Sequence, residues 1–551
     1  MSPDAPTTPA ASLDDQAAGE RRLGLLILEN KTGAALAAGV PHLRKAAALW
    51  EQAGRPSRKA ESLIDLGRLH TKMGRHADAA ETYTEALRVL DSLGEQRAAL
   101  EAASQSALCW LRQGEHAKAL ISSTRAVELA EALNDHVQTA FALADLGQVH
   151  IARHDHVAAL TALSRALTIF TNFRKGVQRA AVLELMAAAH AVAGDLAQAG
   201  DSYERSAALS LELARSYEAT ETLAHYADLL RDRSDLVGAL AVHERCLVIH
   251  RQSGNKALEA QALRRIGVVQ VKAGALDQAR AAYQRSLDLC QAVEDKDGIS
   301  RSLYLLGACA ARSGDVDGAI ARFTDSLTAA EKHDNLQHQE QALAALANVH
   351  RQRGAAADAL AAMQRWVEIL KRLGERADTL RVIGQIAEVH REQGHTGEAE
   401  ATLRKLIDVT TRPEDIRERR RAKAALGLLL SRHGDLAEAT DLLDQALAEH
   451  GNEEPAEQAR LLEQVGTNRL KQGDVEAGQA NYELALACLD RQDDPKLRAK
   501  ILVGLGNAHS AGGNRDQAKD FLDRAAEVSE RQGDLRATTI IRRATRDLSA
   551  R

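Results

Sequence analysis

The chain has 551 residues, and its 71 Lys and Arg residues against 77 Asp and Glu give a formal net charge of −6, which argues against a general nucleic-acid binder because such proteins carry a basic excess. Aromatic residues make up only 3% and prolines number 8, so the composition excludes a large core built on aromatic rings and favours long helices. No apolar run reaches the roughly 18 residues of a membrane-spanning helix, so we expect no membrane partner.

Two segments precede the regular part of the chain. Residues 1–13 are rich in Pro, Thr and Ala, with no basic start and no apolar centre, so they predict a disordered tail rather than a secretion signal. Residues 14–55 predict a degenerate N-terminal repeat, since Leu43 and Gly54 match Tyr83 and Gly94 one period later. We expect a cytoplasmic protein, because the five cysteines form no CxxC pair and sit in apolar stretches, as buried thiols in a reducing compartment do.

Residues 56–533 consist of twelve copies of one unit. The period is 40 residues, with a single step of 39. A column of small residues marks every unit: Gly67, Ala107, Gly147, Ala187, Ala227, Gly267, Gly307, Ala347, Ala387, Gly427, Gly466 and Gly506. A fixed period of this length indicates a repeat architecture rather than several unrelated domains.

Each unit predicts two helices. In the first unit an apolar stripe that includes Leu63 and Leu66 ends at Gly74, and a second stripe that includes Tyr83 ends at Gly94. The small column lets the paired helices approach closely. Two units replace the turn glycine, one by His154 and one by Ser234. The prolines of the regular part fall between units or in the first turn of a helix, which tolerates a missing N–H: Pro56, Pro413, Pro455 and Pro495.

The C-terminal segment, residues 534–551, predicts one more helix that caps the array. It carries Ile540 and Ile541 on one side and many arginines on the other. A terminal helix with a polar outer face keeps a repeat array soluble.

The repeated phrases LGRLHTKMGRHADAAETYTEAL (66–87) and LGACAARSGDVDGAIARFTDSL (306–327) resemble the tetratricopeptide repeat in its long, 40-residue variant. This variant occurs in GoLoco-type adaptors, kinesin light chains and the sensor regions of bacterial regulators. The resemblance implies an all-α fold, a right-handed α-solenoid superhelix of about thirteen helix-turn-helix repeats, whose concave groove binds a protein or peptide partner. We expect one continuous thin core and no independent second domain.

The sequence carries none of the common catalytic or phosphate-binding motifs. The chain has no phosphate-binding loop, no HExxH and no GxSxG. His150, His154 and His156 are the best metal candidates, but His150 belongs to a repeated column and His156 to another, so a structural role is favoured. We therefore predict no enzyme, no cofactor and no metal.

The groove-facing positions of the first helices change from acidic to basic along the chain. One column reads Glu61, Glu101, Phe141, Ala181, Glu221, Gln261, Arg301, Gln341, Arg381, Arg421, Arg460 and Lys500. With its neighbours, this column predicts a partner-binding set: Arg264, Lys272, Arg301, Arg312, Asn348, Arg351, Arg381, Arg391, Arg421, Arg460, Lys471 and Lys500. The hypothesis is that this set binds an acidic segment.

Alternatives remain open from the sequence. The basic residues also fit solvated faces paired with Glu388, Glu392 and Glu463. The family's carboxylate clamp is not reproduced, because Asn348 and Asn507 are preceded one turn earlier by Ala344 and Val503 rather than by Lys or Arg. The first functional hypothesis is a scaffold or adaptor, the second is a ligand- or peptide-sensing regulatory protein that acts on a partner, and RNA binding is a weaker third. The oligomeric state is not determined by these patterns.

Overall fold

The computed structural model describes residues 12–449, 454–492 and 494–550, and its ordered elements there are α-helices with two short 3₁₀ turns. The prediction of an all-α fold is confirmed. The predicted tail lies mostly outside the described residues, and the first helix already begins at Leu13, where the Ser12 side chain accepts a hydrogen bond from the Asp15 N–H. The chain divides into two compact units, residues 1–282 and 283–551, and each is described by itself.

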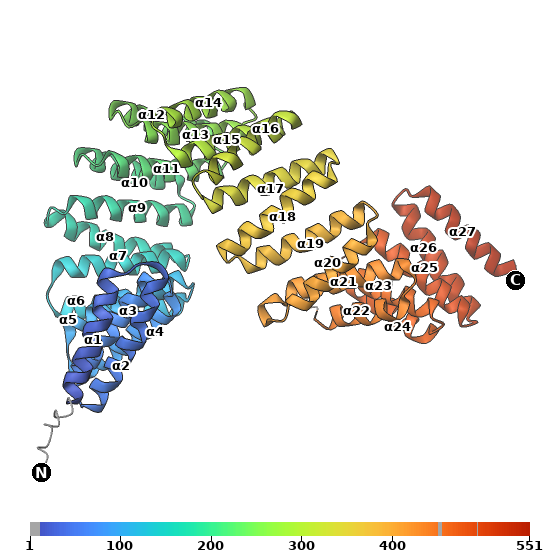
Figure 1. Cartoon of the computed structure of the whole chain (residues 1–551), viewed down its shortest axis with the longest axis horizontal. Helices are drawn as coiled ribbons and strands as arrows, with labels where there is room; N and C mark the ends of the chain where they lie inside the picture. Colours follow the sequence, from blue (N-terminus) through green and yellow to red (C-terminus); the bar gives the residue numbers. More distant parts are fainter. Residues whose placement is uncertain (1–11, 450–453, 493, 551) are drawn as a thin grey trace, which may run out of the picture. The chain divides into compact units, whose positions relative to one another are not determined.

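The first unit consists of antiparallel helical pairs joined by tight turns (Figure 1). Its helices are α1 (Leu13–Asn30), α2 (Gly39–Gln52), α3 (Pro56–Lys72), α4 (His76–Leu93), α5 (Gln96–Arg112), α6 (His116–Ala132), α7 (His136–Ala152), α8 (His156–Asn172), α9 (Gly176–Ala193), α10 (Leu196–Glu212), α11 (Ser216–Asp232), α12 (Leu236–Gln252) and α13 (Lys256–Lys272), with the turn η1 (Gly33–Ala38). The boundary between the units falls within α14 (Leu276–Ala292).

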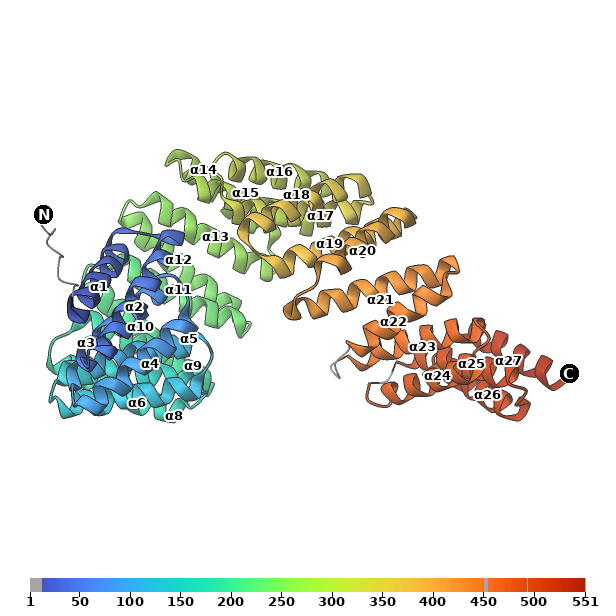
Figure 2. The ribbon, with the colours of Figure 1, turned by 60° about the horizontal axis from the view of Figure 1, so that its bottom comes forward.

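The second unit repeats the same pairing, as Figure 2 shows from another side. Its helices are α15 (Lys296–Arg312), α16 (Val316–Glu331), α17 (Leu336–Arg353), α18 (Ala356–Leu373), α19 (Arg376–Glu392), α20 (Thr396–Val409), α21 (Ile416–His433), α22 (Leu436–Ala448), α23 (Pro455–Lys471), α24 (Val475–Leu489), α25 (Pro495–Ala511), α26 (Arg515–Arg531) and α27 (Leu535–Ala550), with the turn η2 (Pro413–Asp415).

The turns inside the pairs and between them have the left-handed conformation that the glycines predicted. Gly74 has φ +74° and Gly94 has φ +73°. His154 and Ser234, which replace the turn glycine, adopt the same conformation with φ +60° and +66°. A left-handed residue with a Cβ costs roughly 1–2 kcal/mol, so the packing of the two helices, and not the turn residue alone, determines the turn.

The small column of the first helices is explained by the side chain that lies over it. A Cβ built on Gly67 would lie 2.7 Å from Cε1 of Tyr83, and one on Gly307 would lie 2.8 Å from the Phe323 ring. Both rings are buried and belong to the second helix of the same pair. The predicted close approach of the paired helices is therefore confirmed, with one large side chain opposite each glycine.

The cores within each unit are thin and rich in Ala and Leu. The largest buried cluster of the first unit extends from Ala47 to Ala189, and the second unit has a cluster around Trp366 and Met363. Four of the five cysteines are buried, as predicted, and Cys488 is partly exposed. That one core continues through both units stays a prediction.

The capping helix α27 agrees with its prediction only in part. Ile541 is buried in a cluster with Leu502 and Leu522, whereas Ile540 is 61% exposed. The expectation that both isoleucines pack on the same side was wrong, because consecutive residues of an α-helix point about 100° apart. No helix among the described residues is long and apolar enough to cross a membrane.

The close approach at Gly67 can be tested by adding one methyl group. We expect Gly67→Ala to lower the free energy of unfolding by about 1–2 kcal/mol, because the new Cβ meets the Tyr83 ring. The matched control is Gly384→Ala in α19, where the nearest atom, Leu406 Cδ2, is 3.7 Å from the ideal Cβ, and there the better helix propensity of alanine should stabilise by about 0.5–1 kcal/mol. Urea unfolding followed by circular dichroism measures both changes, and equal shifts would contradict the packing argument.

Candidate partner-binding groove

The first helices of successive pairs lie side by side within each unit. In the second unit α19 contacts α21 directly, and in the first unit α5 contacts α7 and α7 contacts α9. We call the face that these first helices form the inner face of each unit, and the predicted binding positions are on the helices that form it. One hollow on this face lies between α19 and α21, over α20.

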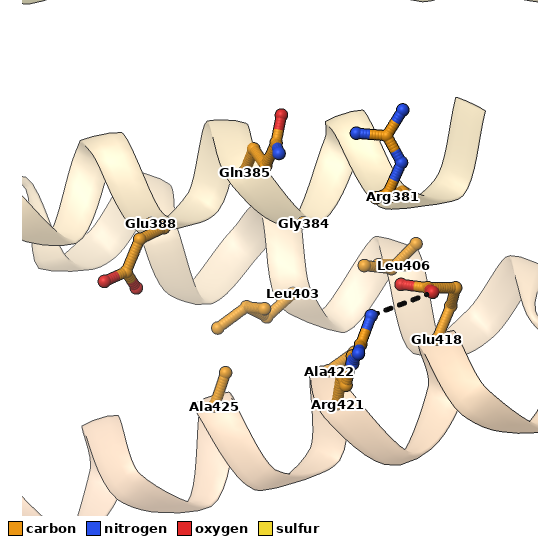
Figure 3. A pocket seen from close by; sticks show the side chains of 10 residues that line it. All are labelled: Arg381, Gly384, Gln385, Glu388, Leu403, Leu406, Glu418, Arg421, Ala422 and Ala425. Atoms are coloured by element: carbon orange, nitrogen blue, oxygen red, sulfur yellow. Dashed lines mark hydrogen bonds and ion pairs between the residues drawn. The ribbon is translucent and has the colours of Figure 1, made fainter. Parts of the chain in front are cut away.

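This hollow is a cavity of about 320 Å³, drawn in Figure 3. Its lining residues are Arg381, Gly384, Gln385, Glu388, Leu403, Leu406, Glu418, Arg421, Ala422 and Ala425. A second cavity of about 260 Å³ shares Glu388 and Ala425 with it and adds Arg391, Leu428, Leu429 and Arg432. We call the two cavities together the α19–α21 groove.

Local sequence explains why the groove opens here. Gly384 takes a position where the two preceding first helices carry Tyr304 and Ala344, so α19 places no side chain over Leu406 of α20 at this point. In addition, α20 has only 14 residues while α18 has 18. A proline ring disfavours the helical conformation of the preceding residue, and Arg412, before Pro413, is extended with ψ 153°, so the chain does not continue the helix after Val409 to the length of α18.

An arginine holds the shortened helix to the next pair. The Arg376 guanidinium donates to the Val409 carbonyl at 2.7 Å and to the buried Asp415 carboxylate at 2.7 Å. These hydrogen bonds hold the pKa of Asp415 below its usual range. The end of α20 and the start of α21 are thus joined through one side chain of α19, which positions both walls of the groove.

The predicted basic residues of the groove are neutralised by carboxylates of their own helices. Arg381 bonds Asp378 at 2.7 Å, the Arg391 Nε donates to Glu388 at 2.8 Å, and Arg421 lies 3.4 Å from Glu418. In each pair the carboxylate precedes the arginine by three residues, so both lie on one helix face. The Arg391 hydrogen bonds lower the pKa of Glu388.

The other predicted residues of the second unit divide into two groups. Arg351 lies 3.7 Å from Glu392, Arg460 lies 3.1 Å from Asp494, and Lys500 lies 2.7 Å from the buried Glu463. The second group is exposed and has no ion-pair partner within the described part of the chain: Arg301, Arg312, Asn348 and Lys471. The pairing with Glu388, Glu392 and Glu463 that the sequence left open is therefore present, while a binding role for these residues stays a prediction.

Two predicted residues belong to the first unit. Arg264 and Lys272 are both on α13, and the Lys272 ammonium donates to the Arg231 carbonyl at 2.8 Å. Of the predicted set, Arg381 and Arg421 line the first cavity of the α19–α21 groove, and Arg391 lines the adjoining one. Sequence reasoning missed the groove floor, whose signals were a glycine in place of a larger residue and the proline that shortens α20.

The histidines of the repeated column lie against neighbouring helices and do not gather. His70 is buried, and its Nδ1 lies 3.8 Å from the Asp78 carboxylate, while the equivalent atom of His150 is 3.6 Å from Asp155. Burial lowers the pKa of both rings. Among residues 12–449, 454–492 and 494–550, no three His, Cys, Asp or Glu side chains are close enough to hold a metal ion.

One family model, described as tetratricopeptide repeat, matches the chain at residues 35–92, 98–172, 218–292 and 258–332. A second model with the same description matches residues 385–454. Together these matches cover more than half of the chain. The chain belongs to the tetratricopeptide repeat family. No curated protein sequence matches it.

Several solved structures are similar to this tetratricopeptide repeat protein at low identity. BtubC (BKLC) from P. vanneervenii is 18% identical, with a TM-score of 0.32 over 39% of this chain and 91% of its own. Repeats of a Podosopora anserina putative kinesin light chain are 15% identical, with a TM-score of 0.33 over 37% of this chain and 99% of their own. A Rap protein complexed with competence and sporulation factor is 15% identical, with a TM-score of 0.32 over 66% of this chain and 99% of its own.

Acid should destabilise the first unit through His243. This ring is 1% exposed on α12, its Nδ1 has no hydrogen-bond partner, and Arg231, Arg265 and Asp228 are the charged groups around it. Burial lowers its pKa to about 4 from 6.5. Between these values the unfolded state binds more protons, so the stability contribution is present above pH 6.5 and is lost as the pH falls to 4, by about 3 kcal/mol.

The measurement is the free energy of unfolding at pH 7 and at pH 4.5 for the parent and for His243→Gln. We expect the variant to show the smaller loss on acidification. Exposed His333→Gln is the matched control and should behave like the parent. An unchanged acid loss in His243→Gln would contradict the assignment.

Proposed function

We propose that this tetratricopeptide repeat protein is a non-catalytic interaction scaffold that holds an acidic, extended partner segment in the α19–α21 groove. The observation that carries the proposal is an apolar floor bordered by arginines in two adjoining cavities between α19 and α21. Pockets that bind peptides and small ligands combine these features, with apolar surface for affinity and a few polar groups for orientation.

The floor supports a buried apolar anchor. Leu403 and Leu406 of α20 lie beneath Gly384, and Ala422 and Ala425 of α21 form the opposite wall (Figure 3). These side chains offer no hydrogen bond, so an aliphatic or aromatic side chain of the partner is the group that gains by entering. The adjoining cavity extends along the same two helices, which suits a segment that continues beyond its anchor.

The rim supports acidic residues on either side of that anchor. Arg381, Arg391 and Arg421 are held by carboxylates three residues earlier, so their guanidinium groups are oriented before a partner arrives. Arg432, which lines the adjoining cavity, is exposed and has no ion-pair partner among the residues described. A partner carboxylate pairs with Arg432 directly and competes with Glu388 for Arg391.

The competition between a partner carboxylate and Glu388 for Arg391 distinguishes binding in this groove from nonspecific attraction to a charged surface. A sensing role, the second hypothesis from the sequence, would in addition need the helix arrangement to change on binding, which X-ray scattering with and without the bound segment measures.

The partner segment can be isolated through the groove itself. A photo-reactive p-benzoylphenylalanine at Gln385 should cross-link a partner from the protein's own cell lysate, and mass spectrometry then identifies the linked peptide. The matched position is Gln364, exposed on the second helix α18, which should not link the same peptide. The identified segment is synthesised with a fluorescent label for binding measurements.

The labelled segment tests both the floor and the rim. We expect Gly384→Leu to weaken binding at least about tenfold by filling the cavity, and Arg391→Gln to weaken it several-fold. Glu388→Gln should strengthen binding, because it releases Arg391 from its own carboxylate. Fluorescence anisotropy measures each affinity.

The control for these variants is Arg365→Gln. This arginine is on α18 and pairs with Glu331, outside the groove, so its replacement should not change the affinity. A linked segment without acidic residues, or equal affinity for all of the variants, would overturn the proposal.

A further inference from the structure

Asp145 is a half-buried carboxylate on α7, on the inner face of the first unit, with no hydrogen-bond or ion-pair partner among the described residues. Burial raises its pKa from 3.8 to about 7, and no nearby charge contributes to that shift. Such a group is unfavourable when it is ionised, because its charge is desolvated without compensation. Its position can be compared with equivalent positions in the same array.

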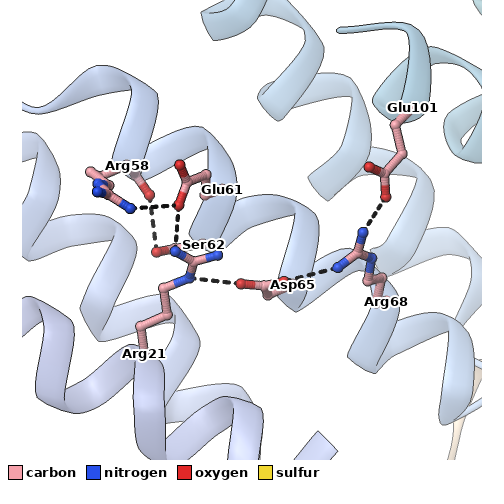
Figure 4. A network of polar contacts seen from close by, with 7 residues as sticks. All are labelled: Arg21, Arg58, Glu61, Ser62, Asp65, Arg68 and Glu101. Carbon is pink, nitrogen blue, oxygen red and sulfur yellow. Dashed lines mark hydrogen bonds and ion pairs between the residues drawn. The ribbon is translucent and has the colours of Figure 1, made fainter. Parts of the chain in front are cut away.

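The equivalent residue two periods earlier, Asp65 of α3, shows what a carboxylate at this position binds. It accepts a hydrogen bond from Arg21 Nε at 2.8 Å and one from Arg68 at 3.3 Å (Figure 4). Arg21 lies 44 residues before Asp65, on the preceding first helix, and Arg68 lies three residues after it. Asp65 is buried, and burial raises its pKa, while the hydrogen bond from Arg21 and the charges of Arg21 and Arg68 act in the opposite direction and stabilise the carboxylate.

Neither of these cations is present around Asp145. The residue 44 positions earlier is Glu101, which itself accepts a hydrogen bond from Arg68, and the residue three positions later is Gln148. Residues that are 44 positions apart on adjacent first helices also touch elsewhere in this unit, since Glu221 accepts a hydrogen bond from Arg265 at 3.0 Å. Asp145 is therefore a position where the chain omits the cation that it supplies at Asp65.

A second feature on the same helix face points to the missing group. Phe141 lies one helical turn before Asp145 and is 41% exposed, although most large apolar side chains of the array are buried. Its ring is held edge-on against the buried Phe170, with 5.1 Å between the ring centroids. An exposed aromatic ring one turn from an unpaired carboxylate attracts a cation through both its π face and the carboxylate charge.

We propose that Asp145 and Phe141 form a binding site for an arginine side chain of a partner protein segment. Arginine is favoured over lysine because the array already uses a guanidinium at the equivalent carboxylate, where Arg21 bridges Asp65 and Glu61 through two different nitrogens. The site is separate from the α19–α21 groove and prefers the opposite charge, so each proposal can fail without the other.

The test is peptide selection against the full-length protein. Random twelve-residue peptides displayed on phage are selected for binding, with counter-selection on the Asp145→Asn variant. We expect the surviving peptides to share an arginine, and their affinity to fall about tenfold or more for Asp145→Asn and for Phe141→Ala. Replacing that arginine by citrulline, which keeps the shape and removes the charge, should cost as much as Asp145→Asn, and the two changes should not add.

The variants are expected to fold. Because the pKa of Asp145 is raised, the folded state binds more protons between pH 4 and 7 and loses stability as the pH rises. Asp145→Asn should therefore raise the urea midpoint at pH 8. The matched control is Asp201→Asn on the second helix α10, whose carboxylate is exposed and pairs with Arg205, and it should leave peptide binding unchanged.

Four results would overturn the proposal. The selection yields no peptide that depends on Asp145, the selected peptides lack arginine, or citrulline binds as well as arginine. Binding of a free polyamine such as spermidine with the same dependence on Asp145, without any selected arginine peptide, would also overturn it, because the occupant would then be a small amine.

Discussion

The close approach of the two helices in each pair is the constraint on which the rest of the structure depends. One large side chain from the second helix lies where the Cβ of the first-helix residue would be, as Tyr83 does over Gly67 and Leu163 over Gly147. This contact fixes how the helices of a pair cross, and the pairs then stack in the same way. The left-handed turns at His154 and Ser234 show that the packing imposes the turn even where glycine is absent.

Because this contact lies between the helices, the inner face is free to vary. Its residues on the first helices take part in charge pairs rather than in the core, and most of these pairs form within one helix or between adjacent first helices. The α19–α21 groove lies where the regular pattern is broken. Gly384 removes a side chain, Pro413 shortens α20, and Arg376 fastens the end of α20 to Asp415.

Candidate binding sites on the inner face are therefore recognised where a residue differs from the residues at equivalent positions of the other repeats. Arg391 and Glu388 form a local pair that a partner carboxylate can enter, whereas Asp145 lacks the partner that Asp65 has at the same position. A repeat array allows this comparison because equivalent residues occupy equivalent surroundings, so an uncompensated charge is recognised against its own repeats.

The sequence by itself determined the family, the helical pairs and the close packing, because a 40-residue period of small and apolar residues can be satisfied by one local arrangement. It also indicated the basic positions of the inner face, but not whether each basic side chain is paired with a carboxylate. Only the tertiary structure decided that Arg381, Arg391 and Arg421 line two adjoining cavities, that Arg460 and Lys500 pair with Asp494 and Glu463, and that Ile540 is exposed. The spacing of charged residues along one helix specifies which face of that helix is charged. Whether a charge is paired, and how deep a groove is, depends on side chains that adjacent helices bring within a few ångströms.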